Sequence, residues 1–275
     1  MGPMHERELH DLAVKGFGAA GARYESGRPD YPPAGVALLA ARLGIGPGAT
    51  VADVGAGTGK LTRALVATGA TVIAVEPLAS MRDQIPFTAP RAVPFDGTAE
   101  AMALRDGSMD AITVAQAFHW FDGPRALAEF HRVLRPRGHL GLLWNERDRA
   151  TPWVAAFDRI IDAVDPDRPD HALGRWRTAF DTTRLFTPLE HATVPYARIH
   201  RLPDGLIGRI ATVSSVAALP PADQERIFGE VRALVQTHPD LAGRSEVELP
   251  YRTHLYWCRR TDESAPRLSR DQQPG

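Results

Sequence analysis

The fold is decided by the stretch Val51-Ala52-Asp53-Val54-Gly55-Ala56-Gly57-Thr58-Gly59. A short apolar run stops there at three glycines within five residues, and residues 60–66 then place Leu61, Leu65 and Val66 at helical spacing. This order predicts a strand, a tight turn and a helix. Glycines let the backbone turn sharply and approach a ligand without a Cβ in the way. The first N–H groups of the following helix would face that ligand.

Three kinds of nucleotide-binding loop compete for this stretch. A dinucleotide loop has the pattern G-x-G-x-x-G, and Lys60 stands where its third glycine belongs. A P-loop has the pattern G-x-x-x-x-G-K-[ST], and Val54 and Leu61 occupy two of its required positions. The observed D-x-G-x-G-x-G instead resembles the first motif of class I S-adenosylmethionine-dependent methyltransferases. An ordinary glycine turn in an α/β domain is the alternative that needs no ligand.

A second anchor follows the glycines in the apolar run Ala70-Thr71-Val72-Ile73-Ala74-Val75-Glu76-Pro77. A carboxylate at the C-terminal end of such a strand can accept hydrogen bonds from both hydroxyls of a ribose. NAD-dependent enzymes and methyltransferases share this device, so Glu76 indicates an adenosine-type ligand without naming it. The alternative is a solvated acid at the end of a strand.

Composition excludes several classes of protein. The 275 residues are 44% apolar and 24% charged, which is ordinary for a globular protein. A net charge of -1 argues against a nucleic-acid or membrane partner. The one cysteine, Cys258, rules out a disulfide framework and a thiolate cluster for metal, and it fits a reducing cytoplasm. No secretory leader is expected from the polar first residues, and no apolar run is long enough to predict a transmembrane helix.

Periodicity predicts alternating strands and helices after residue 50. We expect strands near 50–54, 71–76, 91–95, 110–115 and 138–144, with helices near 59–68, 78–85, 98–102 and 123–135. Asp122 suits the N-cap of the last helix and Pro124 its first turn. Such alternation implies a doubly wound parallel sheet with helices on both faces. Its ligands bind beyond the C-terminal ends of the strands, at the point where the strand order reverses.

Two further strand ends would meet the glycine loop and Glu76 in that crevice. Residues 97–99, after the third strand, combine a polar side chain with small ones and could bracket an adenine edge. Residues 115–122, after the fourth, contain the cluster Phe118-His119-Trp120. These side chains could face a substrate, and a packed aromatic core with a structural histidine is the alternative.

Five motifs in order make the resemblance specific. Asp-Val-Gly-Ala-Gly-Thr-Gly, Val-Glu-Pro, Gly-Thr-Ala-Glu, Ala-Gln-Ala-Phe-His-Trp-Phe-Asp and Glu-x-x-Arg-Val-Leu-Arg-Pro stand at 53–59, 75–77, 97–100, 115–122 and 129–136. Together with the lead-in of Tyr24, Arg28-Pro29 and Tyr31-Pro32, they resemble small-molecule class I methyltransferases of the type 11-like kind. The resemblance implies a seven-stranded, mostly parallel Rossmann-like sheet whose last strand is antiparallel. It also implies S-adenosyl-L-methionine as cofactor, with Tyr24, Arg28, Asp53, Gly55, Ala56, Gly57, Glu76, Pro77, Met81, Thr98, Ala99, Glu100 and Gln116 around it.

The chain divides into three parts. Residues 1–33 would form an N-terminal helix, near 5–20, and a segment that covers the cofactor. Residues 34–260 would form the methyltransferase domain, from a helix over 34–44 to a final strand over 246–257, with further helices at 152–164 and 170–182 and strand within 185–201. A helical insertion over 203–243 would roof the substrate pocket, with Leu206, Ile207, Ile210 and Val213 as its apolar wall. The alternatives are a homodimer interface and plain packing on the edge of the sheet. The polar tail 261–275 is expected to be disordered.

The predicted function is methyl transfer from S-adenosylmethionine to an oxygen, nitrogen or carbon atom of a small molecule in the cytoplasm. The predicted substrate residues are Phe118, His119, Trp120 and Ile210, with no metal. His119 is the candidate general base, because an imidazole titrates near neutral pH. A protein that binds S-adenosylmethionine without transferring methyl, in a cyclase-like or partner role, stays open, as does a nicotinamide-dependent oxidoreductase.

Overall fold

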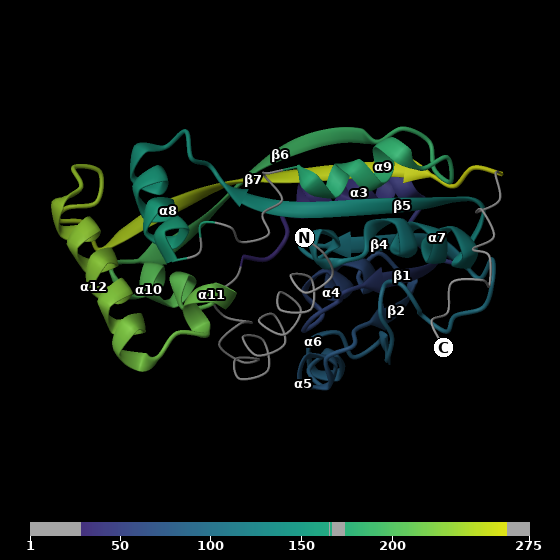
Figure 1. Cartoon of the computed structure of the whole chain (residues 1–275), viewed down its shortest axis with the longest axis horizontal. Helices are drawn as coiled ribbons and strands as arrows, with labels where there is room; N and C mark the ends of the chain where they lie inside the picture. The colour runs from purple at the N-terminus through teal and green to yellow at the C-terminus, as the bar shows by residue number, and fades with distance from the viewer. Residues whose placement is uncertain (1–28, 165, 167–173, 263–275) are drawn as a thin grey trace, which may run out of the picture.

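The computed structural model describes residues 29–164, 166 and 174–262, which form one mixed sheet, helices on both of its faces and a helical body beyond one end (Figure 1). The predicted helix over 5–20, residues Tyr24 and Arg28, and the tail from 263 on lie outside the described residues. The strands are β1 Thr50–Val54, β2 Thr71–Val75, β3 Val93–Phe95, β4 Met109–Ala115, β5 Leu134–Arg147, β6 Glu190–Arg201 and β7 Glu246–Arg259.

The strand order confirms the doubly wound fold. In the described residues the sheet has seven strands in the order β3-β2-β1-β4-β5-β7-β6. Neighbouring strands from β3 to β5 pair in parallel, and β7 is antiparallel to both β5 and β6. The chain runs outward from β1 to β3 and then returns to place β4 on the other side of β1. The loops after β1 and β4 therefore open the crevice where such sheets bind ligands.

Helices cover both faces of the sheet because the buried strands are apolar on both sides. On one face α3 (Pro33–Leu43) and α4 (Lys60–Val66) enclose a core with Leu39, Leu65 and Val72. On the other face α7 (Gly123–Val133) and α9 (Thr178–Thr182) enclose a core with Phe118, Phe130 and Trp144. As the sequence predicts, Asp122 caps α7: its Oδ1 accepts a hydrogen bond from the N–H of Arg125 at 3.3 Å.

The strands β5, β6 and β7 carry a second body, which we call the cap. It consists of α8 Pro152–Val164, α10 Asp204–Ile210, α11 Ser214–Ala217 and α12 Pro221–Thr237. Figure 1 shows it beyond the C-terminal end of β5, the side of the sheet on which the glycine loop opens. Asp158 of α8 is 2% exposed and pairs with both Arg147 and Arg149, so the end of β5 is tied to the cap.

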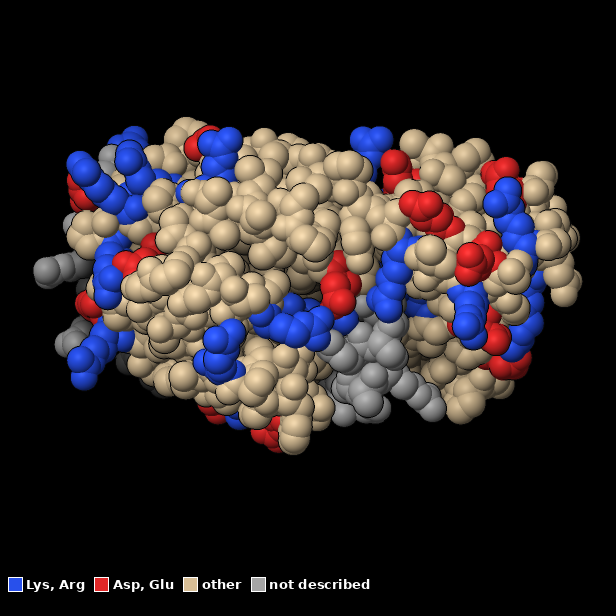
Figure 2. Space-filling view, turned by 180° about the vertical axis from the view of Figure 1, so that it is seen from behind, with Lys and Arg blue, Asp and Glu red and all other residues tan. Residues whose placement is uncertain are grey.

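The face of the molecule shown in Figure 2 carries charges of both signs. Figure 2 shows Lys and Arg side chains interspersed with Asp and Glu, both over the sheet and over the cap. On α12, for example, Arg226 pairs with Glu230 and Arg232 with Glu225. Across the described residues, none of the helices combines the length and apolar character needed to span a membrane.

Three predicted helices differ from the structure. Residues 98–102 are a tight turn closed by a bridge between Thr98 and Ala101, because Ala99 and Met102 are buried in the core below. The segment 78–85 divides into α5 (Ala79–Arg82) and α6 (Ile85–Thr88), with a proline at the start of α6. Of the predicted helix 170–182, the described part is a 3-10 turn at Arg175–Arg177 followed by α9.

Candidate functional site

The glycine loop turns back sharply after β1. Gly55, Gly57 and Gly59 have φ values of 66°, 58° and 91°, a left-handed region that favours glycine. The N–H groups of Gly55 and Ala56 both donate to the carbonyl of Val75, at 2.9 and 3.1 Å. These bonds hold the loop against the end of β2.

Glu76 joins the glycine loop to the end of β2. One carboxylate oxygen accepts a hydrogen bond from the N–H of Gly57 at 2.9 Å, and the other accepts one from the N–H of Leu78 at 3.0 Å. The side chain is 5% exposed, and burial raises its pKa while the two N–H groups lower it. The acid is therefore a fixed part of the loop, and it is not a solvated strand end.

Asp53, near the end of β1, connects the start of the loop to α4 and β4. Its two carboxylate oxygens accept hydrogen bonds from the hydroxyls of Thr62 on α4, at 2.6 Å, and Thr113 on β4, at 2.9 Å. Burial raises the pKa of Asp53 to about 6, against the lowering effect of both threonines. The aspartate thus ties β1 to the neighbouring helix and strand, which keeps the glycine loop in place at the crevice.

Hydrogen bonds hold the segment 29–31 beside the crevice. Asp30 accepts hydrogen bonds from Lys60 at 3.2 Å and Arg63 at 3.0 Å, both on α4. Its backbone carbonyl accepts a bond from the side-chain amide of Asn145 on β5, at 3.1 Å. Thr253 of β7 donates to the amide oxygen of Asn145 at 2.6 Å and so fixes that side chain. The chain before α3 is therefore held between α4 and β5.

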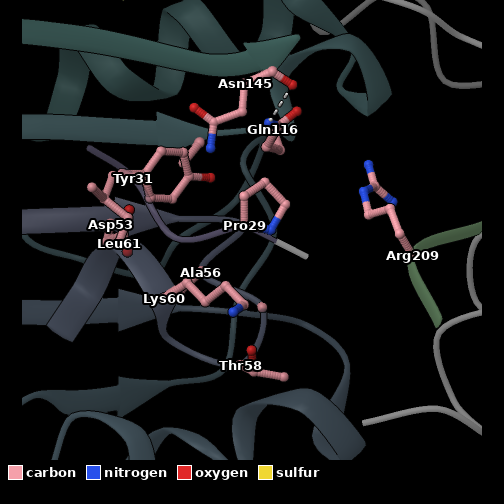
Figure 3. A pocket seen from close by; sticks show the side chains of 13 residues that line it. Pro29, Tyr31, Asp53, Ala56, Thr58, Lys60, Leu61, Gln116, Asn145 and Arg209 are labelled. Carbon is pink, nitrogen blue, oxygen red and sulfur yellow. Dashed lines mark hydrogen bonds between the residues drawn. The ribbon is translucent and has the colours of Figure 1, made fainter. Parts of the chain in front are cut away.

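These elements surround a cavity that we call the crevice cavity (Figure 3). Segment 29–31, the glycine loop, the start of α4, the ends of β4 and β5, and the cap all contribute to it. It is lined by Pro29, Tyr31, Asp53, Gly55, Ala56, Gly57, Thr58, Lys60, Leu61, Ala115, Gln116, Asn145 and Arg209.

Gln116 enters the crevice cavity from the end of β4. Its backbone has a φ of 58°, which is uncommon for a residue other than glycine. Its N–H donates to the carbonyl of Leu143, and its side-chain amide donates to the carbonyl of Asn145 at 3.3 Å. The strained backbone and the side-chain bond together hold the amide at the cavity wall.

The other described residues predicted to bind the cofactor lie outside the cavity lining, and they are Glu76, Pro77, Met81, Thr98, Ala99 and Glu100. Met81 is buried, with its sulfur 3.9 Å from the position that a Cβ on Gly57 would take. Pro77 and Thr98 are exposed, and Ala99 belongs to the core. Glu100 accepts a hydrogen bond from the N–H of Asp122 at 3.0 Å, so its carboxylate joins the turn after β3 to the start of α7.

The predicted base, His119, lines a different cavity. It lies in the 3-10 turn Phe118–Trp120, where Trp120 is half-buried and Phe118 is fully buried among aromatic rings. The aromatic cavity, as we call it, is lined by Phe118, His119, Phe121, Gly123, Pro124, Arg175, Trp176, Thr178, Ala179 and Thr182. Trp144 Nε1 donates to His119 Nδ1 at 3.2 Å. An indole nitrogen can only donate, so Nδ1 of His119 is the acceptor and a neutral His119 carries its proton on Nε2. In this arrangement Nε2 is a hydrogen-bond donor, and neither ring nitrogen is open to accept a proton from a substrate.

Ile210 lies in the cap core, where the sequence predicted a pocket wall. Leu206, Ile210 and Val213 pack with Trp153, Phe157 and the ends of β6 and β7, and Ile210 is fully buried. The apolar stripe of 203–243 is therefore satisfied by α8 and by the strand ends. Among the described residues, Arg209 is the cap's contribution to the crevice cavity.

Comparison with known proteins identifies the family of the chain. Residues 52–142 match the family model described as a methyltransferase domain. A protein of Mycobacterium tuberculosis described as an uncharacterized methyltransferase is 40% identical over 241 residues, which cover 86% of this chain and 92% of the relative. An uncharacterized methyltransferase-like protein of Schizosaccharomyces pombe is 30% identical over 246 residues, covering 89% and 95%. The chain belongs to the methyltransferase family.

Solved structures confirm the fold of this methyltransferase. A candidate Type II methyltransferase from Anaeromyxobacter dehalogenans superposes with a TM-score of 0.58 at 26% identity, covering 84% of this chain and 96% of that one. A second, from the antibiotic biosynthesis pathway of Anabaena variabilis, has a TM-score of 0.56 at 22% identity and shows the fold alone. The fold is that of class I S-adenosylmethionine-dependent methyltransferases.

Sequence reasoning missed several residues of the site. Asn145 and Arg209 carry polar groups to the crevice cavity, and Lys60 and Asp30 pair beside it. Asn145 directly follows the predicted fifth strand, 138–144, so its position beside the crevice could have been predicted from the sequence. Arg209 lies in an insertion whose docking no pattern in the sequence predicts. Among the described residues, no group of three or more His, Cys, Asp or Glu side chains could hold a metal ion.

Proposed function

We propose that this methyltransferase transfers a methyl group from S-adenosylmethionine to a small molecule bound in the crevice cavity between the glycine loop and the cap. The observation that carries the proposal is the hydrogen bond that joins Glu76 to Gly57, a residue that lines this cavity. A carboxylate has about four lone-pair sites, and two N–H groups use two of them. The others remain for the hydroxyls of a ribose.

The residues present fit such a cofactor. Among the described residues, a Cβ built on Gly57 would meet only the sulfur of Met81, at 3.9 Å, so the space beside this glycine is open to the cavity. Gly55 differs, since its Cβ would lie 2.8 Å from the Cβ of Ala117. Both glycines have a positive φ; Gly55 is required by packing as well, whereas Gly57 borders the open space that a ligand would use.

S-adenosylmethionine supplies a sulfonium methyl group: the acceptor atom forms a bond to the methyl carbon while the sulfur–carbon bond breaks, and its electron pair stays on sulfur as S-adenosylhomocysteine. Because this methyl is already activated, the protein's main task is to place the acceptor in line with it. Good positioning lowers a barrier by roughly 7–11 kcal/mol. The rigid walls formed by Gln116 and Asn145, with the cap opposite, suit that task.

Calorimetric titration with S-adenosylhomocysteine and with NAD tests the cofactor. We expect the first to bind and the second to leave no heat of binding. Binding of NAD alone would favour the oxidoreductase and contradict the proposal. Binding of S-adenosylhomocysteine without turnover of any candidate acceptor would favour a protein that uses the cofactor without transferring methyl. Because the chain has a single cysteine and therefore no disulfide framework, we further propose that the protein works in a reducing cytoplasm.

A further inference from the structure

Gln116, directly after β4, presents a side-chain amide to the crevice cavity. Its backbone N–H donates to the carbonyl of Leu143 at 2.9 Å and its side chain donates to the carbonyl of Asn145 at 3.3 Å, so two bonds attach it to β5. Figure 3 shows Gln116 and Asn145 side by side at the cavity wall. The φ of Gln116 is 58°, a conformation that residues other than glycine keep only where their surroundings require it. The amide is therefore held in one place before a ligand binds.

The bond to Asn145 also fixes which end of the Gln116 amide meets a ligand. A backbone carbonyl can only accept a hydrogen bond, so the amide nitrogen must face Asn145. A rotation that exchanged the two ends of the amide would bring two acceptors together and lose the bond. The other end of the amide is Oε1, an acceptor with two lone pairs. The cavity wall therefore presents a hydrogen-bond acceptor at Gln116.

The neighbouring amide of Asn145 is fixed in the same way, with its oxygen engaged. Its nitrogen donates to the carbonyl of Asp30 at 3.1 Å, and its oxygen accepts a bond from the hydroxyl of Thr253 at 2.6 Å. Thr253 is fully buried in β7, so this second bond is shielded from water. Of these two amide oxygens, the one without a bond to the described residues is that of Gln116.

The strand order separates this wall from the residue assigned to the ribose of the cofactor. Glu76 follows β2, and the glycine loop follows β1, which lies between β2 and β4. Neighbouring strands lie about 4.8 Å apart, so Gln116 follows a strand about 10 Å from that of Glu76. The part of the cavity at β4 and β5 is therefore left for the reacting end of the cofactor and for the acceptor.

We propose that the methyl acceptor is a neutral amine and that the amide oxygen of Gln116 accepts a hydrogen bond from its N–H group. The proposal rests on the proposed function, since it names the class of acceptor for the same methyl transfer. An amide oxygen can orient a nucleophile, but it is not a general base. A neutral amine needs no base before transfer, because its lone pair is available while one N–H group bonds to Gln116.

The transfer is balanced in atoms and charge. The nitrogen lone pair forms the bond to the methyl carbon, the sulfur–carbon bond breaks, and its electron pair stays on sulfur. Nitrogen then carries a positive charge, and the methylammonium product loses its extra proton to water. As that charge develops, the N–H group becomes a stronger donor, so its bond to Gln116 is stronger in the transition state than in the bound substrate.

Gln116→Met removes the amide and keeps the length of the side chain. For the amine that wild type uses best, we expect kcat to fall by about tenfold to a hundredfold, the range for a hydrogen bond to a charged group. KM should change less than kcat, because the bound neutral amine makes a weaker bond than the transition state. Unchanged kcat would overturn the role of Gln116.

Gln116→Asn is a second test, for the case that the methionine variant does not fold. Asparagine tolerates a positive φ, and its side chain is one methylene shorter, so its oxygen is withdrawn from the acceptor. We expect the same loss of kcat. Gln236→Met, on the exposed face of α12, is the matched control and should behave as wild type. Melting temperature reports whether each variant folds.

The ammonium group of the cofactor could donate to the same amide oxygen, and two ligands separate this case from the proposal. S-adenosylhomocysteine carries that ammonium group, and 5′-methylthioadenosine lacks it. We expect Gln116→Met to bind both with wild-type affinity. A loss of affinity for S-adenosylhomocysteine alone would assign Gln116 to the cofactor and overturn the proposal.

The acceptor class is tested with matched pairs: ethylamine with ethanol, aniline with phenol, benzylamine with benzyl alcohol, and tryptamine with tryptophol. Formation of S-adenosylhomocysteine is the readout, and we expect wild type to methylate an amine in preference to its alcohol. If wild type binds S-adenosylhomocysteine but methylates the alcohols as well as the amines, or none of the amines, the acceptor class is wrong and the proposed cofactor stands. If wild type does not bind S-adenosylhomocysteine, the proposed function itself fails.

Discussion

The backbone N–H of Gly57 donates to the carboxylate of Glu76 across 2.9 Å, which joins the loop after β1 to the acid after β2. The two residues are separated by 19 positions in the chain. Glu76 therefore has two roles. Its carboxylate shapes the loop by accepting the backbone N–H groups of Gly57 and Leu78, and its remaining lone pairs can accept hydrogen bonds from a ligand. A change at Glu76 therefore affects both the binding of cofactor and the stability of the protein without it.

Replacing Glu76 with Ala should weaken S-adenosylhomocysteine binding by about 1.5–3 kcal/mol, through the loss of hydrogen bonds to a charged acceptor. It should also lower the free energy of unfolding by about 1–3 kcal/mol, because the N–H groups of Gly57 and Leu78 lose their partner. Calorimetry and chemical denaturation measure the two effects. Glu76→Gln is the control, since its amide oxygen can still accept one of the two bonds. Unchanged affinity in Glu76→Ala would place the cofactor elsewhere.

The sheet could be predicted from the sequence because each strand, turn and helix end is marked by residues that are close together in the chain. The glycines after β1, the acid after β2 and the proline and cap at α7 all follow from the short-range rules of strands, turns and helix ends. The turn at residues 98–102 does not, because a short apolar run reads equally well as a helix. Burial of Met102 against the core decides its conformation, and that is a tertiary effect.

Alanine at Gly55 and at Gly57 should have different consequences. Both positions have a positive φ, so each substitution carries a cost of roughly 1–2 kcal/mol. At Gly55 the new methyl would also lie 2.8 Å from the Cβ of Ala117, and we expect a further loss of about 1–3 kcal/mol in stability.

At Gly57 the new side chain points into open space, so beyond that backbone cost the loss in Gly57→Ala falls on S-adenosylhomocysteine affinity, and Gly57→Val should abolish binding in a folded protein. Thermal melting and calorimetry on the two alanine variants make the comparison. Equal loss of stability with no loss of affinity at Gly57 would mean that the cofactor does not approach this glycine.

Asp53 should make the protein less stable as pH rises. Its pKa is raised from 3.8 to about 6 in the folded state by burial, so between these values the folded chain binds more protons than the unfolded chain. The stability it contributes is fully present below the lower value and is lost as pH rises through the higher one. A shift of this size corresponds to about 3 kcal/mol.

Asp53→Asn removes that titration and leaves a side chain that can bond to Thr62 and Thr113. We expect the difference in unfolding free energy, variant minus wild type, to increase from about pH 4 to about pH 7 by up to about 3 kcal/mol. Urea denaturation across this range measures it. A difference independent of pH would show that Asp53 titrates normally in the folded protein.

The site was less predictable than the sheet because one of its walls comes from the helical insertion, which lies outside the alternating strands and helices. Arg209 lines the cavity only because α8 and the ends of β6 and β7 bury the apolar neighbours Leu206 and Ile210. The sequence shows the helical periodicity of this insertion and leaves open the surface on which it packs. The cluster Phe118-His119-Trp120 was equally ambiguous: Phe118 is buried in the core, Trp120 is half-buried, and His119 accepts a hydrogen bond from the indole of the core residue Trp144.

Replacing His119 with Ala tests whether this histidine supports Trp144 or acts on the substrate. Trp144 is 1% exposed, so removing the acceptor of its indole N–H should lower stability by about 1–3 kcal/mol. Adding Trp144→Phe should then cost less than it does in wild type, since the donor has already lost its partner, and a double-mutant cycle by denaturation measures that coupling. His119→Asn, which can still accept the bond, should keep stability, cofactor affinity and the pH dependence of methyl transfer. A large loss of kcat in His119→Asn, with stability and cofactor affinity intact and the pH profile altered, would instead establish His119 as a catalytic residue.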